Sequence, residues 1–517
     1  TDYYTLSLHD ALPISTQPSL PRPTPPPAAS YANTPYTPAG AAPGSARPAP
    51  CYSTTMESIF HQMRAASRQD QNPDYSQRRR RLDALHRLLM ENRKALTDAV
   101  AQDFGQRSAE ETQLLELFTC QQSVRHARRH LRKWLRPERR GISIWFRPAR
   151  AEVRPQPLGC VGIVAPWNYP ILLTVAPLVA ALAAGNRAMV KMSELAPATA
   201  QLFAELVGRY FGADEVSIVE GGAETAQAFV RLPFDHLLYT GSTRVARLVL
   251  RETAELLTPV TLELGGKSPV IVTPGFPMAK AAERVMIGKC FNAGQTCVAP
   301  DYVLVPEGME EGFAAACRAA VEASYPRINI NLDYTAIIDD AHFQRLIDCV
   351  ADAKSKGATI VPLADKAVTD PSRRIFPPVA LLGCNTSMRV MREEIFGPIL
   401  PILPYRELGD ALAQINSRER PLALYLFDTD RQRIDHVLDQ TVSGGVTIND
   451  TLFHAAQDNL PFGGVGASGT GQYHGREGFL TFSKLKPVFR QSRFNGAGLL
   501  QPPYGIRFKQ MLRFLMR

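Results

Sequence analysis

The stretch Gly159-Cys160-Val161-Gly162-Ile163-Val164-Ala165 runs directly into Pro166-Trp167-Asn168-Tyr169-Pro170. A short uncharged run that ends at a proline-bounded turn is typical of a strand buried on both faces of a parallel sheet. The apolar residues 171–184 then predict a helix, which Gly185-Asn186 ends, and residues 188–191 predict a second strand. This order predicts a right-handed βαβ unit.

The alternation of strands and helices continues toward the C-terminus. Strands at 216–219 and 236–239 are separated by helices near 199–211 and 224–231. We therefore expect an α/β fold with a Rossmann-like, nucleotide-binding sheet. A second alternation after Thr258 predicts another α/β domain. Its strands are expected at 261–264, 270–272 and 302–305, and its helices at 277–292, 309–323 and 340–356.

The segments at the two ends have a different character. Residues 1–55 include a Pro-, Ala-, Ser- and Thr-rich stretch at 17–50, and the chain begins without methionine. We expect this segment to be disordered, or to be an artefact of translation or assembly, because Met56 opens the first globular pattern. Amphipathic helices are expected at 77–100 and 109–135, and an extended ribbon at 142–153.

The last residues, 504–517, alternate apolar and basic side chains and predict a basic amphipathic helix. Such a helix can lie on a membrane surface or pack on its own protein. We favour packing on protein because a helix this short is a weak membrane anchor.

Composition limits the class of protein. The 517 residues exceed what one ordinary core holds, and 45% hydrophobic with 21% charged residues is typical of a globular protein in water. The net charge of +9 comes largely from 78–81, 125–140 and the last dozen residues, without a nucleic-acid motif, which favours a solvated basic face. Eight cysteines without a C-x-x-C predict a reducing, cytoplasmic setting and no metal site. No apolar run is long enough to span a membrane.

A second stretch, Lys289-Cys290-Phe291-Asn292-Ala293-Gly294-Gln295-Thr296-Cys297-Val298-Ala299-Pro300, contains two cysteines. Cys297 lies in a polar turn between an expected helix and the strand at 302–305, where a thiol can meet a substrate. We interpret it as a covalent nucleophile. Buried, unreactive thiols are expected at the other positions considered, which are Cys120, Cys160, Cys290, Cys317, Cys349 and Cys384.

Glu263 is a carboxylate within an otherwise apolar strand, flanked by Thr261-Leu262 and Leu264. Burial there should raise its pKa toward the range of a general base. The alternative is a buried glutamate paired with Lys267. Asn168, taken alone, would by default be a turn residue between a strand and a helix.

Six motifs in a fixed order carry a strong resemblance to the aldehyde dehydrogenase superfamily, from about Met56 to Arg490. They are Pro166-Trp167-Asn168, Lys191-Met192-Ser193-Glu194, Leu262-Glu263-Leu264-Gly265-Gly266-Lys267, Gly294-Gln295-Thr296-Cys297, Glu393-Glu394-Ile395-Phe396-Gly397-Pro398 and Pro461-Phe462-Gly463-Gly464-Val465-Gly466.

Further features resemble the class-3 branch of that superfamily, namely Asn449-Asp450, His454 and Gly471-Gln472-Tyr473-His474-Gly475. The run from Val153 into Pro170 is most similar to the coniferyl aldehyde dehydrogenase group within it.

The resemblance implies a three-part organisation. An NAD-binding domain would comprise 56–141 and 159–262, and a catalytic domain 263–438. Strands in 142–158 and 439–490 would form an oligomerisation arm, and 491–517 a C-terminal tail. Relatives of this branch are usually dimers, so a homodimer is expected.

The resemblance also assigns catalytic roles. The Cys297 thiolate would attack the aldehyde to give a thiohemiacetal, and hydride loss to a nicotinamide would leave a thioester. The Asn168 side-chain amide and the Cys297 backbone N–H would stabilise the oxyanion. Water activated by Glu263 would then release the carboxylic acid.

Cofactor contacts are implied for a further set of residues. Glu194 would repel a 2′-phosphate, which favours NAD over NADP, although class-3 relatives often accept both. Ala246 stands where the family pattern has glycine, which puts the close approach of the pyrophosphate in question. The implied cofactor-binding residues are Pro166, Trp167, Lys191, Glu194, Gly241, Ser242, Thr243, Ala246, Glu394 and Phe396.

Two other functions remain open at this point. A CoA-acylating relative would pass the acyl group to CoA, but it would have no need for Glu263 as a base. A non-catalytic binding protein would be expected to lack the thiol, base or amide. The aldehyde itself is expected to be aromatic, such as coniferyl aldehyde, or a medium- or long-chain aliphatic one. Candidates for an apolar tunnel are Phe118, Tyr169 and the segment Thr451–His454.

Overall fold

The computed structural model describes residues 52–496, 498 and 501–516. Nearly all of the segment predicted to be disordered or artefactual lies outside these residues. The first helix, α1 (Tyr52–Gln69), begins four residues before Met56, so the globular part starts slightly earlier than expected.

The first sheet has six strands in the order β15-β7-β6-β3-β4-β5 and is parallel except for β15. The strand order reverses between β3 and β6, so their carboxyl ends mark a topological switch point, where ligands bind in folds of this kind. The strands are β3 (Cys160–Val164), β4 (Arg187–Lys191), β5 (Val216–Val219), β6 (His236–Thr240), β7 (Val260–Glu263) and β15 (Gly469–Thr470).

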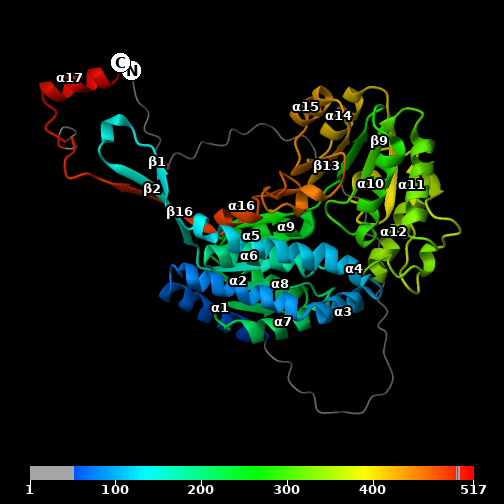
Figure 1. Ribbon diagram of the computed structural model, residues 1–517, viewed down its shortest axis with the longest axis horizontal. Helices are drawn as coiled ribbons and strands as arrows, with labels where there is room; N and C mark the ends of the chain where they lie inside the picture. The colour runs from blue at the N-terminus through cyan, green and yellow to red at the C-terminus, as the bar shows by residue number, and fades with distance from the viewer. Residues whose placement is uncertain (1–51, 497, 499–500, 517) are drawn as a thin grey trace, which may run out of the picture. The chain divides into compact units, whose positions relative to one another are not determined.

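Helices connect these strands and cover the sheet (Figure 1). The connecting helices are α6 (Leu172–Ala184), α7 (Pro197–Tyr210), α8 (Ala223–Val230) and α9 (Thr243–Ala254). Almost every residue of α6 is buried, as expected for a helix that is apolar all round. The prediction of a Rossmann-like sheet is confirmed.

The predicted helix 77–100 is two helices, α2 (Tyr75–Glu91) and α3 (Arg93–Phe104). Asn92 separates them because its side-chain amide donates to the Leu88 carbonyl (2.9 Å) and to the Tyr210 hydroxyl (3.1 Å). The second predicted helix is continuous but contains a π-helical segment. Its parts are α4 (Ala109–Thr112), the π-helix Gln113–Phe118 and α5 (Thr119–Trp134).

The arginine run at 78–81 is not simply a solvated basic face. Arg78 is buried, and its guanidinium donates to the carbonyls of Pro73, Ala183 and Ala184, the last two at the end of α6. Arg81 is also buried and pairs with Glu215 at 3.0 Å. Half of this charge run therefore holds α2 against the first sheet.

The second sheet has seven strands in the order β10-β11-β12-β9-β8-β13-β14, with β10 antiparallel to the rest. The strands are β8 (Pro269–Val272), β9 (Tyr302–Pro306), β10 (Thr359–Pro362), β11 (Val379–Leu382), β12 (Ile399–Tyr405), β13 (Ala423–Phe427) and β14 (Gly445–Ile448). The helices are α10 (Met278–Cys290), α11 (Glu310–Ser324), α12 (Asp340–Ser355), α13 (Arg389–Arg392), α14 (Leu408–Asn416) and α15 (Arg431–Gln440). The strand expected at 261–264 does not open this domain, because it is β7 of the first sheet.

A third, antiparallel sheet consists of β1 (Glu138–Arg140), β2 (Arg150–Pro157) and β16 (Ser483–Arg490). We call residues 138–157 and 483–490 the arm. The expected ribbon at 142–153 is interrupted by a 3₁₀ turn at Ile144–Phe146. The assignment of all of 439–490 to arm strands was wrong, because β14 and β15 belong to the other two sheets and α16 (Gly475–Thr481) is helical.

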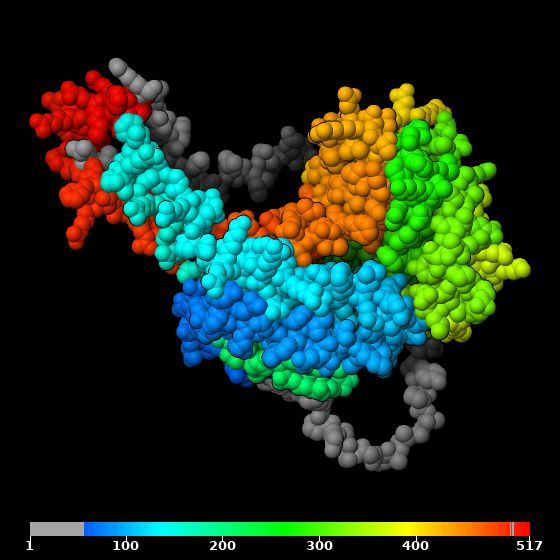
Figure 2. All heavy atoms as spheres, viewed as in Figure 1, coloured from blue at the N-terminus to red at the C-terminus, as the bar shows by residue number. Residues whose placement is uncertain are grey.

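The predicted C-terminal helix is α17 (Ile506–Leu515). Its Phe514 ring lies 6.4 Å from the Trp145 ring, and Figure 2 shows the red C-terminal residues beside the cyan arm. The helix nevertheless buries none of its residues, so its packing on its own protein stays a prediction. Within the part of the chain that the structure describes, no helix combines the length and apolarity that crossing a membrane requires.

Candidate active site

A cavity of about 250 Å³ lies at the switch point between β3 and β6. The turn after β3 supplies Pro166, Trp167 and Asn168, and the turn after β6 supplies Gly241 and Ser242. Residues from the second sheet's domain complete the wall. The lining residues are Pro166, Trp167, Asn168, Leu173, Thr240, Gly241, Ser242, Glu263, Leu264, Gly265, Cys297, His342, Arg345, Glu394, Phe396, Leu422, Phe462 and Tyr473.

Cys297 lies in the turn between α10 and β9, as predicted, and it is half-buried. Burial of the thiol and the nearby carboxylates of Glu394 and Glu263 raise its pKa to about 12. The resting group is therefore a protonated thiol, and reaction requires a base. Cys290, at the end of α10, is buried, which confirms the prediction that it packs in the core.

The other described cysteines are free. Cys384 is half-buried rather than buried, whereas Cys120, Cys160, Cys317 and Cys349 are buried as expected.

Glu263 is the last residue of β7, and 2% of it is exposed. Among the described residues, neither of its carboxylate oxygens has a hydrogen-bond partner. Burial raises its pKa well above the usual value of a glutamate. The proposed pairing with Lys267 is wrong, because the Lys267 ammonium pairs with Asp301. A buried carboxyl with free oxygens facing a cavity is suited to accept a proton there.

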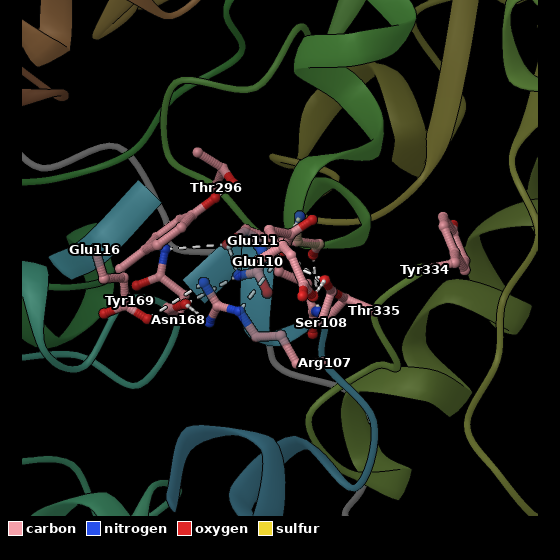
Figure 3. A network of polar contacts seen from close by, with 12 residues as sticks. Arg107, Ser108, Glu110, Glu111, Glu116, Asn168, Tyr169, Thr296, Tyr334 and Thr335 are labelled. Atoms are coloured by element: carbon pink, nitrogen blue, oxygen red, sulfur yellow. Dashed lines mark hydrogen bonds and ion pairs between the residues drawn. The ribbon is translucent and has the colours of Figure 1, made fainter. Parts of the chain in front are cut away.

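The Asn168 side chain, which Figure 3 labels, is buried. Its amide donates to the carbonyl of Gln295, two residues before Cys297, at 3.1 Å. The Asn168 carbonyl in turn accepts from the Asn292 side chain at 2.9 Å. The residue is thus fixed on both sides, and it borders the same cavity as the thiol. The turn explanation alone does not account for this arrangement.

The glycine turn after β6 leads into α9. The Ser242 side chain caps this helix by accepting from the Val245 N–H at 3.4 Å, and Gly241 and Ser242 line the cavity. The N-terminus of a helix presents free N–H groups that suit a phosphate. Thr243 and Ala246 do not line the cavity in the part of the chain that the structure describes. The Thr243 hydroxyl donates to the Ala467 carbonyl at 3.2 Å, and Ala246 packs in the core.

Lys191 and Glu194 follow β4 and also lie outside the described lining of this cavity. Lys191 is buried, and its ammonium donates to the Met192 carbonyl at 2.6 Å and lies 3.8 Å from Glu194. Burial lowers its pKa. The two side chains stand at the end of a strand adjacent to β3, where the resemblance places a ribose.

Glu394 and Phe396 line the cavity opposite the first sheet. Burial raises the pKa of Glu394 to about 8. A Cβ atom at Gly265 would lie 2.0 Å from a Glu394 carboxylate oxygen, so a larger residue there would displace the Glu394 carboxylate. The Phe396 ring is 5.5 Å from the Trp167 ring. A carboxylate and two aromatic rings in this cavity suit the nicotinamide end of a dinucleotide.

The sequence did not predict several of the residues that line the cavity, among them Leu173, His342, Leu422, Phe462 and Tyr473. Phe462 and Tyr473 stand in motifs already recognised, so that signal was available. In the part of the chain that the structure describes, the proposed tunnel residues Phe118, Tyr169 and Thr451–His454 do not line this cavity. Tyr169 is buried with its hydroxyl 2.8 Å from that of Thr296, and Phe118 is exposed on the π-helix.

The comparisons with known proteins agree with this site. The sequence model of the aldehyde dehydrogenase family matches residues 42–488. A probable coniferyl aldehyde dehydrogenase of Pseudomonas aeruginosa is 50% identical over 457 residues, covering 88% of this chain and 95% of that protein. The coniferyl aldehyde dehydrogenase of a Pseudomonas species is 44% identical over 471 residues, covering 90% of this chain and 98% of that protein.

Solved structures are also similar. AldH of Staphylococcus aureus, in a substrate-bound state, has a TM-score of 0.84 and 37% identity, covering 89% of this chain and 99% of that one. An aldehyde dehydrogenase of Mycobacterium tuberculosis complexed with NAD⁺ has a TM-score of 0.76 and 28% identity, covering 84% and 90%. The chain belongs to the aldehyde dehydrogenase family. It is an enzyme that oxidises aldehydes with NAD(P).

Proposed function

We propose that this enzyme oxidises an aromatic aldehyde of the coniferyl type, or a medium- or long-chain aliphatic aldehyde, to the carboxylic acid, with NAD as the preferred acceptor. One observation carries the proposal: Cys297, Glu263 and Asn168 border a single cavity that also contains the glycine turn before α9. The first sheet then serves as the NAD-binding domain, and the second sheet's domain carries the thiol.

In the first half of the reaction, the Cys297 sulfur forms a bond to the aldehyde carbon after its proton passes to a base. Glu263 suits that role because its carboxylate oxygens are free of protein partners in the described structure. The carbonyl oxygen becomes an oxyanion, which the Asn168 amide and the Cys297 N–H stabilise. As the oxyanion collapses, hydride leaves the aldehyde carbon and a thioester on Cys297 remains. When bound, the nicotinamide ring would supply the hydride acceptor.

Glu263 releases the thiol proton to solvent before the second half of the reaction. It then takes a proton from water as the water oxygen bonds to the thioester carbon. The C–S bond then breaks, the acid leaves, and the Cys297 sulfur is free for another cycle. Because burial raises the pKa of Glu263, its ionised carboxylate is a stronger base than that of an exposed glutamate. Hydrolysis by water accounts for a buried carboxylate in this cavity, and transfer to CoA does not.

The preference for NAD rests on Glu194, since a carboxylate beside the ribose disfavours a 2′-phosphate. Its partner Lys191 is 3.8 Å away and is held by the Met192 carbonyl. The proposal therefore assigns ribose recognition to this pair, at the end of the strand next to β3.

The substrate class rests on the apolar part of the cavity, namely Leu173, Leu422, Phe462 and Tyr473. Such a wall suits a planar aromatic ring or an alkyl chain. Three curated relatives at 44–50% identity are named as coniferyl aldehyde dehydrogenases or probable ones, which favours the aromatic class.

A homodimer is proposed from the arm. The arm exposes large apolar side chains, including Trp145, which is 62% exposed, and also Ile144, Phe146, Leu485 and Phe489. A set of this size on a projecting sheet is typical of a surface that another chain covers. We further propose that the dimer works in the cytoplasm, consistent with the free cysteines in the described part of the chain.

The direct test is NADH formation from coniferyl, benzyl and long-chain aldehydes, with NAD or NADP and with or without CoA. Coniferyl aldehyde with NAD should give the highest kcat/KM. Cys297→Ala should abolish turnover, while the matched control Cys290→Ala should keep it. Turnover that depends on CoA, or that survives Cys297→Ala, contradicts the proposal.

A further inference from the structure

Three hydrogen bonds join the turn after β3, at 166–170, to the cysteine turn, which we define as residues 291–301. Figure 3 labels Asn168, Tyr169 and Thr296 from these two turns. The Asn168 amide donates to the Gln295 carbonyl at 3.1 Å, and the Asn292 amide donates to the Asn168 carbonyl at 2.9 Å. The Tyr169 hydroxyl lies 2.8 Å from the Thr296 hydroxyl. All of these groups are buried, so water competes little for them.

The cysteine turn has an unfavourable backbone conformation. Asn292 and Ala293 have φ values of 52° and 49°, in the left-handed region that side chains other than glycine seldom adopt. Glu111 accepts from the Asn292 N–H at 3.0 Å. The Gln295 side chain closes the turn by donating to the Asn292 carbonyl at 2.9 Å and to the Ala336 carbonyl at 3.1 Å. The surrounding contacts therefore hold the strained turn in one geometry.

Arg107 also links the two turns. Its side chain is 0% exposed, and its Nη1 donates to the Asn168 carbonyl at 3.1 Å. The same guanidinium lies 3.6 Å from Glu111 and 3.2 Å from Glu116. The Asn168 carbonyl thus accepts from both Arg107 and Asn292, which fixes the peptide that precedes Tyr169.

Glu116 connects this cluster to α6. It lies on the π-helical segment, and its carboxylate accepts from the N–H groups of Ile171 at 2.8 Å and Leu172 at 3.0 Å. These N–H groups begin the helix that follows the Pro166–Pro170 turn. A π-helical segment widens the helix locally and often occurs beside functional sites. Here it carries the carboxylate that anchors the far side of the turn.

We infer that Arg107 and Asn292 are positioning residues, which act on the reaction by holding the Asn168 amide beside the Cys297 turn. The inference rests on the proposed role of that amide as an oxyanion donor. Neither residue lines the described cavity, so neither contacts the reacting atoms. A displacement of about 1 Å in such a donor can cost about 10²-fold in rate, and its complete loss costs about 10²–10³-fold.

Asn292→Gly is the sharpest test, because glycine keeps the left-handed backbone and removes only the side-chain bonds. Ala293→Gly is the matched control, since it makes the same backbone change one residue later and removes no hydrogen bond. Asn292→Gly should lower the single-turnover rate of NADH formation about 10-fold or more, with the aldehyde KM within about 2-fold of wild type. Ala293→Gly should stay within about 3-fold of the wild-type rate.

A double-mutant cycle separates positioning from a general loss of stability. If Asn292 acts through the Asn168 amide, Asn292→Gly should lower the rate by less than about 3-fold in an Asn168→Ala background. An equal loss in both backgrounds, or a rate for Asn292→Gly that matches Ala293→Gly, overturns the inference. If Asn292→Gly does not fold, the same cycle with Arg107→Lys decides, because lysine keeps the charge between Glu111 and Glu116 but cannot span all three partners.

A different set of results would contradict the proposed function. Turnover that survives Cys297→Ala, or the absence of NADH formation in the wild type, removes the reaction itself. If the wild type has normal kinetics and Asn292→Gly has no effect, only the positioning role is contradicted.

Discussion

Replacing Glu263 by glutamine changes one carboxylate oxygen into an amide group of the same size. Because neither oxygen of Glu263 has a hydrogen-bond partner among the described residues, the substitution breaks no hydrogen bond with the protein. It does remove the ability to take a proton from water. The variant therefore separates the chemistry of Glu263 from its packing.

Two opposite effects follow. General base catalysis typically contributes about 10²–10⁴-fold, so the steady-state kcat should fall by about that factor. Stability should change the other way. Burial raises the pKa of Glu263, so the folded protein binds a proton that the unfolded chain releases above its pKa of about 4.3. Ionisation of Glu263 therefore costs stability as pH rises from that value through the folded pKa. Glutamine has no such cost.

The assay is stopped-flow NADH formation together with thermal unfolding at several pH values. Glu263→Gln should give a burst close to one NADH per active site, followed by slow turnover, because acylation precedes the hydrolytic step. Its Tm should equal the wild-type value near pH 4 and exceed it at pH 7–8. Steady-state turnover at the wild-type rate, or a Tm below wild type at pH 8, would refute this reasoning.

Three further predictions concern other parts of the molecule. Lys267→Met should destabilise the protein by about 3–5 kcal/mol in urea unfolding, because it leaves the buried Asp301 carboxylate without the cation of its ion pair; an unchanged midpoint would contradict this. Glu194→Gln should raise the ratio of kcat/KM with NADP to that with NAD about 10-fold or more by removing a negative charge near the ribose, and a constant ratio would argue against the assigned position. The double substitution of Trp145 and Phe146 by serine should shift the protein from dimer to monomer in sedimentation while the monomer stays folded; a dimer that persists would exclude this surface as the contact.

Much of the fold was predictable from the sequence. The run at 159–165 and its following turn were recognisable because a strand buried on both faces has no polar alternation, and β3 confirms it. The sequence could not show that the segment around Asn92 forms two helices rather than one. The break has no glycine or proline, and it depends on a contact with Tyr210 more than a hundred residues away.

Local sequence patterns also could not predict which sheet each strand joins. The segment at 260–263 reads as a buried strand in either domain, and only its hydrogen bonds to β6 place it in the first sheet. Similarly, β14, β15 and β16 lie within fifty residues of each other but belong to three different sheets.

Motif order predicted the residues that border the cavity, including Cys297, Glu263 and Asn168. It did not predict the cluster behind them. Arg107 reads as an ordinary polar residue between two helices, and its role depends on a burial that unites residues 107, 116, 168 and 292. Such clusters are visible only when distant segments are placed together.

The central claim is that the reaction passes through a thioester on Cys297. The most direct measurement is mass spectrometry of Glu263→Gln after mixing with coniferyl aldehyde and NAD and quenching in acid. Trypsin should release the peptide 290–318, which contains Cys290, Cys297 and Cys317, and fragmentation locates the acyl group among the three. We predict the added acyl mass on Cys297. An acyl group on Cys290 or Cys317, or a burst of NADH without any acylated peptide, would contradict the account.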